Sequence, residues 1–376
     1  MARPETGQLL LTGVPGPELD ARSAALYREV QPGGFILFGR NIKSPAQLRK
    51  LVDDLRSLCD IEPIITIDQE GGRVSRLRLI GNEPPNAQQL RDHGSLDLIS
   101  RHGAITARLL RLFGFNLDLC PVLDISFDDD ADNSLRGRCY GRDVAETVRN
   151  AAAFNDSLRK GGIASCGKHF PGYSRAPLDA HHELPVIPLT QADLDEHELA
   201  VFRAFLAPGK SPYPEPGAVD SMMICHAQYP HLEPGGLPAS LSRRIVTGLL
   251  REQMGYRGLI MTDDLDMGAI LNHYTLDQTI RLAIAAGNDL AMICHRVDSL
   301  PEARSILDRI PAAELDPALE SVAAFKKHMA PPDPFSEDEF RLRDADVFQL
   351  RLDTLGPALA AGRSPEDGKR SPVEIY

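Results

Sequence analysis

The hydrophobic positions of the chain fall into eight short runs that are almost continuously apolar. Runs of this length without polar alternation are typical of strands that are buried on both faces of a parallel sheet. The predicted strands are residues 8–14, 34–38, 63–67, 116–121, 164–170, 221–227, 258–262 and 289–294.

The segments between these runs show a helical pattern instead. In residues 44–58, Ser44 suits the N-cap and Pro45 suits the first helical position. Apolar residues then recur on one stripe of this helix, at Leu48, Leu51, Val52, Leu55 and Leu58. The same spacing predicts helices over residues 144–158, 191–205, 240–253, 276–286 and 301–310.

Eight strands that alternate with helices predict an α/β fold, a (β/α)8 TIM-type barrel, which we expect to occupy residues 1–330 as a single catalytic domain. The alternative is a doubly wound open sheet, which usually carries a G-x-G-x-x-G turn after its first strand. The first turn here, GVPG at residues 13–16, does not match that motif.

Two other segments differ from the barrel pattern. Residues 207–217 are dense in Pro and Gly, which predicts a surface loop. Residues 331–376 are expected to form a C-terminal extension with one helix near residues 345–355. The polar end of this extension, residues 362–372, is either poorly ordered or an arm that packs on the barrel or a neighbour.

The composition narrows the class of protein. The chain has 376 residues, of which 43% are hydrophobic and 25% charged, enough for a sizeable core. Its formal net charge is −12 and no Lys/Arg-rich run occurs, which argues against nucleic acid or an anionic membrane as a partner. No stretch has the length and apolarity of a membrane span, and residues 1–11 lack the features of a signal peptide.

The six cysteines are scattered and form no CxxC pair, so we expect no structural zinc site. Four of them, Cys120, Cys166, Cys225 and Cys294, lie in strand-like runs, where a free thiol behaves as a small hydrophobe. Unpaired cysteines favour a reducing, cytoplasmic location.

An acidic cluster follows the seventh predicted strand directly, and in this fold catalytic residues lie at the carboxyl ends of strands. A carboxylate at such a rim is half desolvated and can act as a nucleophile. We assign that role to Asp263, the residue nearest the strand. Asp264 or Asp266 is expected to cap the following helix.

Polar residues also follow four other strands. They are Asp68 with Arg73 and Arg76 after the third strand, Asp124 with Arg138 after the fourth, Lys168 and His169 at the end of the fifth, and His226 at the end of the sixth. The segment after the fifth strand adds Asp179 and His181, which are spaced so that the carboxylate can orient the imidazole. Together these residues favour acid/base-assisted displacement at a sugar carbon. A zinc site formed by His169, His181, His182 and His226 is the weaker alternative, because no H-E-x-x-H spacing is present.

Four motifs occur in one order along the chain: IDQEGGRV at residues 67–74, KHFPG at 168–172, DAH at 179–181 and TD at 262–263. Together they resemble the single-domain β-N-acetylglucosaminidases of glycoside hydrolase family 3, and the likeness runs from about residue 33 to residue 294. The family usually continues KHFPG with His-Gly, where this chain has Tyr173 and Ser174. The middle residue of its D-x-H motif is often Ser, where this chain has Ala180.

The resemblance implies retaining hydrolysis of terminal, non-reducing β-linked N-acetylglucosamine, with no metal and no organic cofactor. By the resemblance, Asp263 is the nucleophile that forms a glycosyl-enzyme intermediate, and His181 is the acid/base, oriented by Asp179. The sugar-binding residues implied are Asp68, Arg76, Arg138, Lys168 and His169. The expected substrates are peptidoglycan-derived muropeptides, processed in the cytoplasm during cell-wall recycling.

Other functions remain open from the sequence. A related β-glucosidase or a broader hexosaminidase would use the same barrel. A phosphorylase is a further alternative, because a histidine acid/base does not repel an incoming phosphate as a glutamate would. A non-catalytic saccharide-binding barrel would have no need for Asp179, His181 and Asp263 together.

Overall fold

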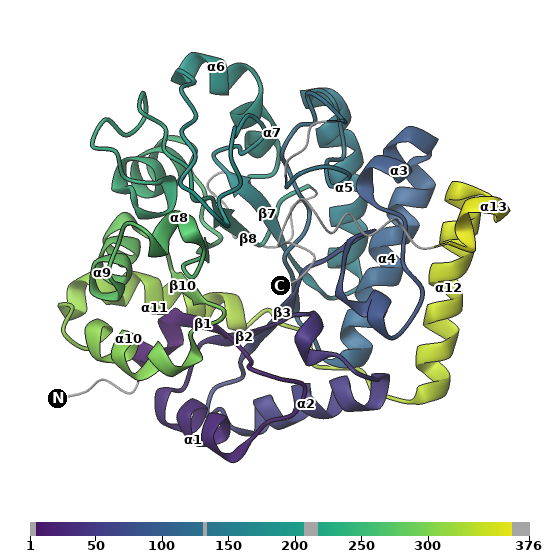
Figure 1. The fold of residues 1–376 in the computed structure, drawn as a ribbon, viewed down its shortest axis with the longest axis horizontal. Coiled ribbons are helices and arrows are strands. Elements are labelled where there is room, and N and C mark those ends of the chain that lie inside the picture. Colours follow the sequence, from purple (N-terminus) through teal and green to yellow (C-terminus); the bar gives the residue numbers. More distant parts are fainter. Residues whose placement is uncertain (1–4, 131–133, 207–216, 363–376) are drawn as a thin grey trace.

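The computed structural model describes residues 5–130, 134–206 and 217–362. Within it, parallel strands close into a barrel in the order β1-β10-β9-β8-β7-β6-β3-β2, surrounded by helices (Figure 1). This confirms the predicted (β/α)8 barrel. The strands are β1 (Leu10–Gly13), β2 (Gly34–Leu37), β3 (Ile64–Ile67), β6 (Leu117–Asp118), β7 (Ala164–Phe170), β8 (Ser221–Ile224), β9 (Leu259–Asp264) and β10 (Leu290–Ile293).

A short antiparallel hairpin, β4 (Gln69–Gly71) and β5 (Val74–Ser75), follows β3 and was not predicted. Its turn depends on glycine, because Gly71 and Gly72 have φ angles of 114° and 54°. A Cβ atom on Gly71 would also lie 2.3 Å from the main-chain oxygen of Pro85. The hairpin keeps Glu70 close to the end of β3.

The predicted helices are present, with two changes. The segment 191–205 is two helices, α6 (Gln191–Glu196) and α7 (Glu198–Ala204), because His197 between them has φ −125° and ψ −83°, outside the helical region. The segment 240–253 is a 3-10 turn, η4 (Ala239–Leu241), followed by a π-helix, η5 (Arg244–Gln253). The other predicted helices are α2 (Pro45–Ser57), α5 (Val144–Lys160), α9 (Leu276–Ala286) and α10 (Leu300–Leu307).

Several further helices were not predicted. They are α1 (Ala21–Val30), α3 (Ala87–His93), α4 (Leu96–Phe113), α8 (Gly268–Leu271), α11 (Ala312–Lys326) and α13 (Pro357–Ala360). Short 3-10 turns complete the chain: η1 (Thr6–Leu9), η2 (Gly39–Asn41), η3 (Arg76–Leu79) and η6 (Val297–Ser299).

The helix predicted near residues 345–355 begins earlier, as α12 (Glu337–Leu355). It lies on the outside of the barrel beside α3 and α4 (Figure 1). The rings of Phe340 and Phe113 are 5.6 Å apart, and Arg351 pairs with Glu83 at 3.1 Å. Residues 207–216, within the predicted loop, and residues 363–376, at the end of the chain, lie outside the described residues.

Among the helices that the structure describes, none is both long and apolar enough to span a membrane. All six cysteines are free thiols, and five of them are buried.

Candidate active site

A cavity at the carboxyl ends of the strands brings together all the residues that the sequence assigned to catalysis or sugar binding. Arg73 and Asp124, which also follow predicted strands, do not line it. Asp68 directly follows β3, Lys168 and His169 end β7, and Asp263 lies near the end of β9, one residue beyond the predicted strand. The residues that line the cavity include Asp68, Arg76, Arg138, Lys168, His169, Asp179, His181 and Asp263.

One wall of this cavity is a buried cluster of two carboxylates and three cations. The Nζ atom of Lys168 lies 2.7 Å from Oδ1 of Asp68 and 2.6 Å from Oε1 of Glu70. Arg138 donates to both Glu70 oxygens, at 2.8 and 2.9 Å, and Arg76 lies 3.5 Å from Asp68. The cluster holds charged groups in fixed positions from which they can bind hydroxyl groups.

The charges in this cluster stabilise one another. Burial alone raises the pKa of Asp68, but the positive charges of Lys168 and Arg76 outweigh it and hold that pKa below its usual value. Burial likewise opposes the charge of Lys168, yet Asp68 and Glu70 raise its pKa above the usual value. Asp68 and Lys168 are therefore both ionised at neutral pH.

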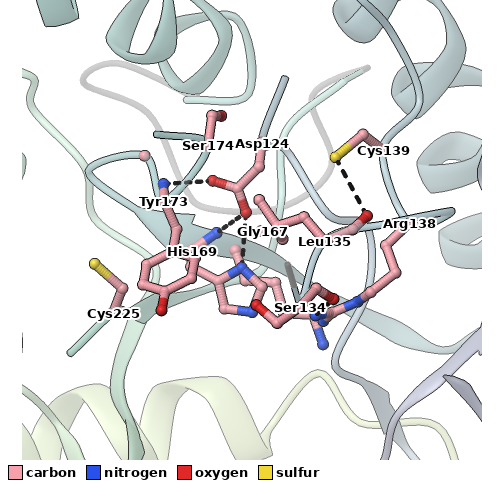
Figure 2. A network of polar contacts seen from close by, with 12 residues as sticks. Asp124, Ser134, Leu135, Arg138, Cys139, Gly167, His169, Tyr173, Ser174 and Cys225 are labelled. Carbon is pink, nitrogen blue, oxygen red and sulfur yellow. Dashed lines mark hydrogen bonds and ion pairs between the residues drawn. The ribbon is translucent and has the colours of Figure 1, made fainter. Parts of the chain in front are cut away.

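A second network is centred on the buried carboxylate of Asp124 (Figure 2). Its Oδ2 accepts from Nδ1 of His169 at 2.7 Å and from the main-chain N–H of that residue at 3.2 Å. Its Oδ1 accepts from the main-chain N–H of Tyr173 at 2.6 Å. Asp124 therefore fixes the His169 imidazole, with its proton on Nδ1, at the edge of the cavity.

The Asp179–His181 pair forms as the spacing predicted. Oδ1 of Asp179 lies 2.6 Å from Nδ1 of His181 and also accepts from the main-chain N–H of His181 at 3.0 Å. A carboxylate bound to Nδ1 fixes the ring and leaves Nε2 as the nitrogen that can exchange a proton with a ligand. The main-chain oxygen of His181 accepts from the N–H of Gly268 at 2.9 Å, which places this pair beside α8 and the end of β9.

Asp263 faces the same cavity, and its Oδ1 accepts from the N–H of Asp264 at 2.8 Å. The expectation that Asp264 or Asp266 caps the next helix is wrong. The residue before α8 is Met267, which makes no capping hydrogen bond, and the cap of α9 is Thr275.

The carboxylates of Asp264 and Asp266 instead bind main-chain N–H groups of the segment after β10. Oδ1 of Asp264 accepts from the N–H of Cys294 at 3.1 Å, and Oδ2 of Asp266 accepts from the N–H groups of His295 and Arg296 at 2.7 and 2.8 Å. These two carboxylates join the end of β9 to the end of β10, because they accept from main-chain N–H groups that have no partner in a strand.

His226 binds the main chain next to Asp263, a role that the sequence did not indicate. Its Nε2 lies 2.9 Å from the main-chain oxygen of Asp264 and its Nδ1 lies 2.8 Å from Oγ of Ser240. Because a carbonyl oxygen only accepts, the proton is on Nε2 and Ser240 donates to Nδ1. Burial lowers the pKa of His226, consistent with this neutral tautomer.

The alternative zinc site is not formed. Across residues 5–130, 134–206 and 217–362, no three or more His, Cys, Asp or Glu side chains gather in a way that would hold a metal ion.

The sequence also missed two residues that support the site, Glu70 and Tyr173. Glu70 was visible only as part of the IDQEGGRV motif, and its partners Lys168 and Arg138 come from distant segments. Tyr173 was visible only as a departure from the family motif.

The barrel, its polar cavity and the similarity to known proteins together define a glycoside hydrolase. Residues 1–325 match the glycosyl hydrolase family 3 N terminal domain, and the chain belongs to this family. This confirms the resemblance drawn from the four motifs.

Similar proteins with assigned names support this placement. The β-hexosaminidase of Vibrio cholerae serotype O1 (strain M66-2) is 32% identical over 307 residues, covering 81% of this chain and 87% of its own length. That of Pseudomonas aeruginosa (strain LESB58) is 31% identical over 304 residues, covering 80% of this chain and 86% of its own.

Solved structures show the same likeness. A glycoside hydrolase family 3 β-N-acetylglucosaminidase from Paenibacillus sp. str. FPU-7 superposes with a TM-score of 0.82 at 30% identity, covering 94% of this chain and 69% of that one. Native NagZ from Neisseria gonorrhoeae superposes with a TM-score of 0.75 at 25% identity, covering 91% of this chain and 97% of that one.

Proposed function

We propose that the protein is a retaining exo-β-N-acetylglucosaminidase. The observation that carries this proposal is that the Asp179–His181 pair and Asp263 line one cavity together with the charged cluster around Lys168. The named relatives, which are β-hexosaminidases and β-N-acetylglucosaminidases, support the same sugar class.

In the proposed reaction Asp263 attacks the anomeric carbon and forms a covalent glycosyl-enzyme ester. Nε2 of His181 gives its proton to the departing oxygen, and Asp179 orients the ring and stabilises its cation. In the second half, His181 takes a proton from water, whose oxygen attacks the anomeric carbon and releases Asp263. Two inversions at one carbon give net retention.

The sugar is held by the charged wall. In this proposal Asp68, Arg76, Arg138, Lys168 and His169 bind its hydroxyl groups, and they do so from fixed positions because each is paired inside the protein. We propose residues 1–330 as the catalytic domain and residues 331–376 as an extension whose helix α12 supports α3 and α4.

We propose muropeptides derived from peptidoglycan as natural substrates, with N-acetylglucosamine as the sugar released, and the cytoplasm as the location. Six free thiols suit a reducing compartment. The similarity to NagZ of Neisseria gonorrhoeae extends over nearly the whole of both chains.

The test is turnover of para-nitrophenyl N-acetyl-β-glucosaminide and para-nitrophenyl β-glucoside, each with and without inorganic phosphate. We expect hydrolysis of the first substrate by the wild type, with no need for phosphate, and none by Asp263→Ala with an unchanged circular dichroism spectrum. Faster release with phosphate and a sugar phosphate product would establish a phosphorylase, and preference for the glucoside a β-glucosidase. Binding of N-acetylglucosamine without turnover of either compound would establish a saccharide-binding barrel.

A further inference from the structure

The hydroxyl of Tyr173 holds the main chain on both sides of Asp179. It donates to the main-chain oxygen of Leu178 at 2.8 Å and accepts from the N–H of Ala180 at 2.9 Å. Because Asp179 is the one residue between these two, a single side-chain atom fixes the chain before and after the carboxylate that binds His181.

The backbone of Tyr173 is fixed in turn by the sugar-binding side of the cavity. Its N–H donates to Oδ1 of Asp124, whose Oδ2 accepts from His169 (Figure 2). The rings of Tyr173 and His169 are 6.0 Å apart, and Tyr173 is 7% exposed. One buried residue therefore connects the His169 side of the cavity to the Asp179–His181 side.

The next residue fastens the same segment at a second point. Oγ of Ser174 accepts from the N–H of Ile125, in the segment that follows β6, at 2.9 Å. Tyr173 and Ser174 directly follow the KHFPG motif, so the two contacts come from neighbouring residues just beyond the end of β7.

The Tyr173 hydroxyl is suited to a permanent contact. Burial raises the pKa of Tyr173, so the hydroxyl keeps its proton at neutral pH and stays a donor to Leu178. Ala180 is also buried, so its N–H would lack a partner in this position if the hydroxyl were removed.

We propose that Tyr173 is a positioning residue for the acid/base pair, acting through Asp179. This inference rests on the proposed function. When the hydroxyl is present, Asp179 keeps its position relative to the sugar-binding residues, and so does His181, which Asp179 binds. Without it, the segment around Asp179 spends less time in the geometry in which Nε2 of His181 reaches the departing oxygen.

The test is Tyr173→Phe, which keeps the ring and the main-chain contact with Asp124. Aryl N-acetyl-β-glucosaminides with graded leaving groups separate its effect on proton donation from a general loss of structure. We expect kcat/KM to fall about tenfold with phenol as leaving group and no more than about twofold with dinitrophenol, which leaves without a proton. The Brønsted plot should become steeper.

The matched control is Tyr256→Phe. Tyr256 is also buried, and its hydroxyl donates to the main-chain oxygen of Val219 at 3.3 Å, near the amino ends of β8 and β9. We expect this variant to keep the wild-type dependence on the leaving group, and the two variants to unfold at similar temperatures.

A uniform loss across leaving groups in Tyr173→Phe, or no loss, would overturn the positioning role. The variant His181→Ala distinguishes an error in the positioning role from an error in the proposed function. If His181→Ala shows the leaving-group dependence and Tyr173→Phe does not, only the positioning inference is wrong. If the wild type does not turn over any of the glycosides, the proposed function itself is wrong.

Discussion

Nε2 of His226 lies 2.9 Å from the main-chain oxygen of Asp264, the residue that follows the proposed nucleophile. The N–H of the same residue donates to Oδ1 of Asp263 at 2.8 Å. The His226 imidazole therefore binds the main-chain oxygen of Asp264, and the main-chain N–H of Asp264 orients the Asp263 carboxylate. Ser240 in turn binds the imidazole.

We expect His226→Ala to lower kcat by on the order of tenfold to a hundredfold, because misplacement of a reacting group by a fraction of an ångström is costly. KM for the aryl N-acetylglucosaminide should change less, since the sugar-binding cluster lies on other strands. Ser240→Ala is the graded control, because it removes only the hydrogen bond to Nδ1 and should cost severalfold less. A wild-type kcat in a folded His226→Ala protein would show that the contact does not support Asp263.

His181→Ala should reduce turnover most for substrates with poor leaving groups, because those need a proton from the enzyme as the bond breaks. General acid catalysis typically contributes about a hundredfold to ten-thousandfold, and this is the loss expected with a phenol leaving group. With dinitrophenol the loss should be far smaller in a single-turnover experiment, which isolates formation of the glycosyl-enzyme. Equal losses across the series would argue against proton donation by His181.

The strands and the site positions could be predicted because both depend on local sequence. A strand buried on both faces must be apolar throughout, so the eight runs were recognisable. Seven of them contain a whole barrel strand, and the run 258–262 contains all of β9 except its last two residues, Asp263 and Asp264. The strand ends and the segments that follow them then located Asp263, the Asp179–His181 pair and the proposed sugar-binding residues, all of which line one cavity. Their chemical roles remain predictions.

What could not be predicted depends on contacts between distant segments. Helix α4 is an exception, because its sequence is as amphipathic as that of the predicted helix α2 and was recognisable from the local pattern. Helix α1 was harder to recognise, since only Ser23, Tyr27 and Val30 are buried. Asp264, the last residue of β9, and Asp266 resemble helix caps in sequence, but their carboxylate oxygens accept from main-chain N–H groups after β10.

Glu70→Gln should both destabilise the protein and weaken substrate binding. The substitution leaves the buried cations Lys168 and Arg138 with one carboxylate fewer, and breaking a buried ion pair typically costs about 3–5 kcal/mol. Denaturant unfolding and KM measure the two effects. The control is Glu62→Gln, which breaks the pair with Arg56; the Glu62 side chain is 53% exposed, so the cost should be below about 1 kcal/mol. Equal effects of the two variants would contradict the importance of the cluster.

The last prediction concerns His102 on α4, which is fully buried against Phe154 of α5, with 5.2 Å between the rings. Neither ring nitrogen finds a hydrogen-bond partner among the described residues. Burial lowers the pKa of His102 from 6.5 to about 4, because a charge in this apolar setting would be poorly solvated.

This shift makes stability depend on pH with a definite sign. The unfolded chain takes up a proton at His102 below pH 6.5, whereas the folded chain does so only near pH 4. The stabilisation that the neutral His102 gives the folded state is therefore complete above pH 6.5. It is lost as the pH falls from 6.5 to about 4, and the loss in the free energy of unfolding is up to about 3 kcal/mol.

His102→Leu, which replaces the ring with an apolar side chain, should flatten the free energy of unfolding over this window. The exposed His93 on α3 is the control, because His93→Gln should leave the wild-type slope in place. Urea unfolding of the three proteins at several pH values measures the slopes, and a wild-type slope in His102→Leu would show that another group causes the acid sensitivity.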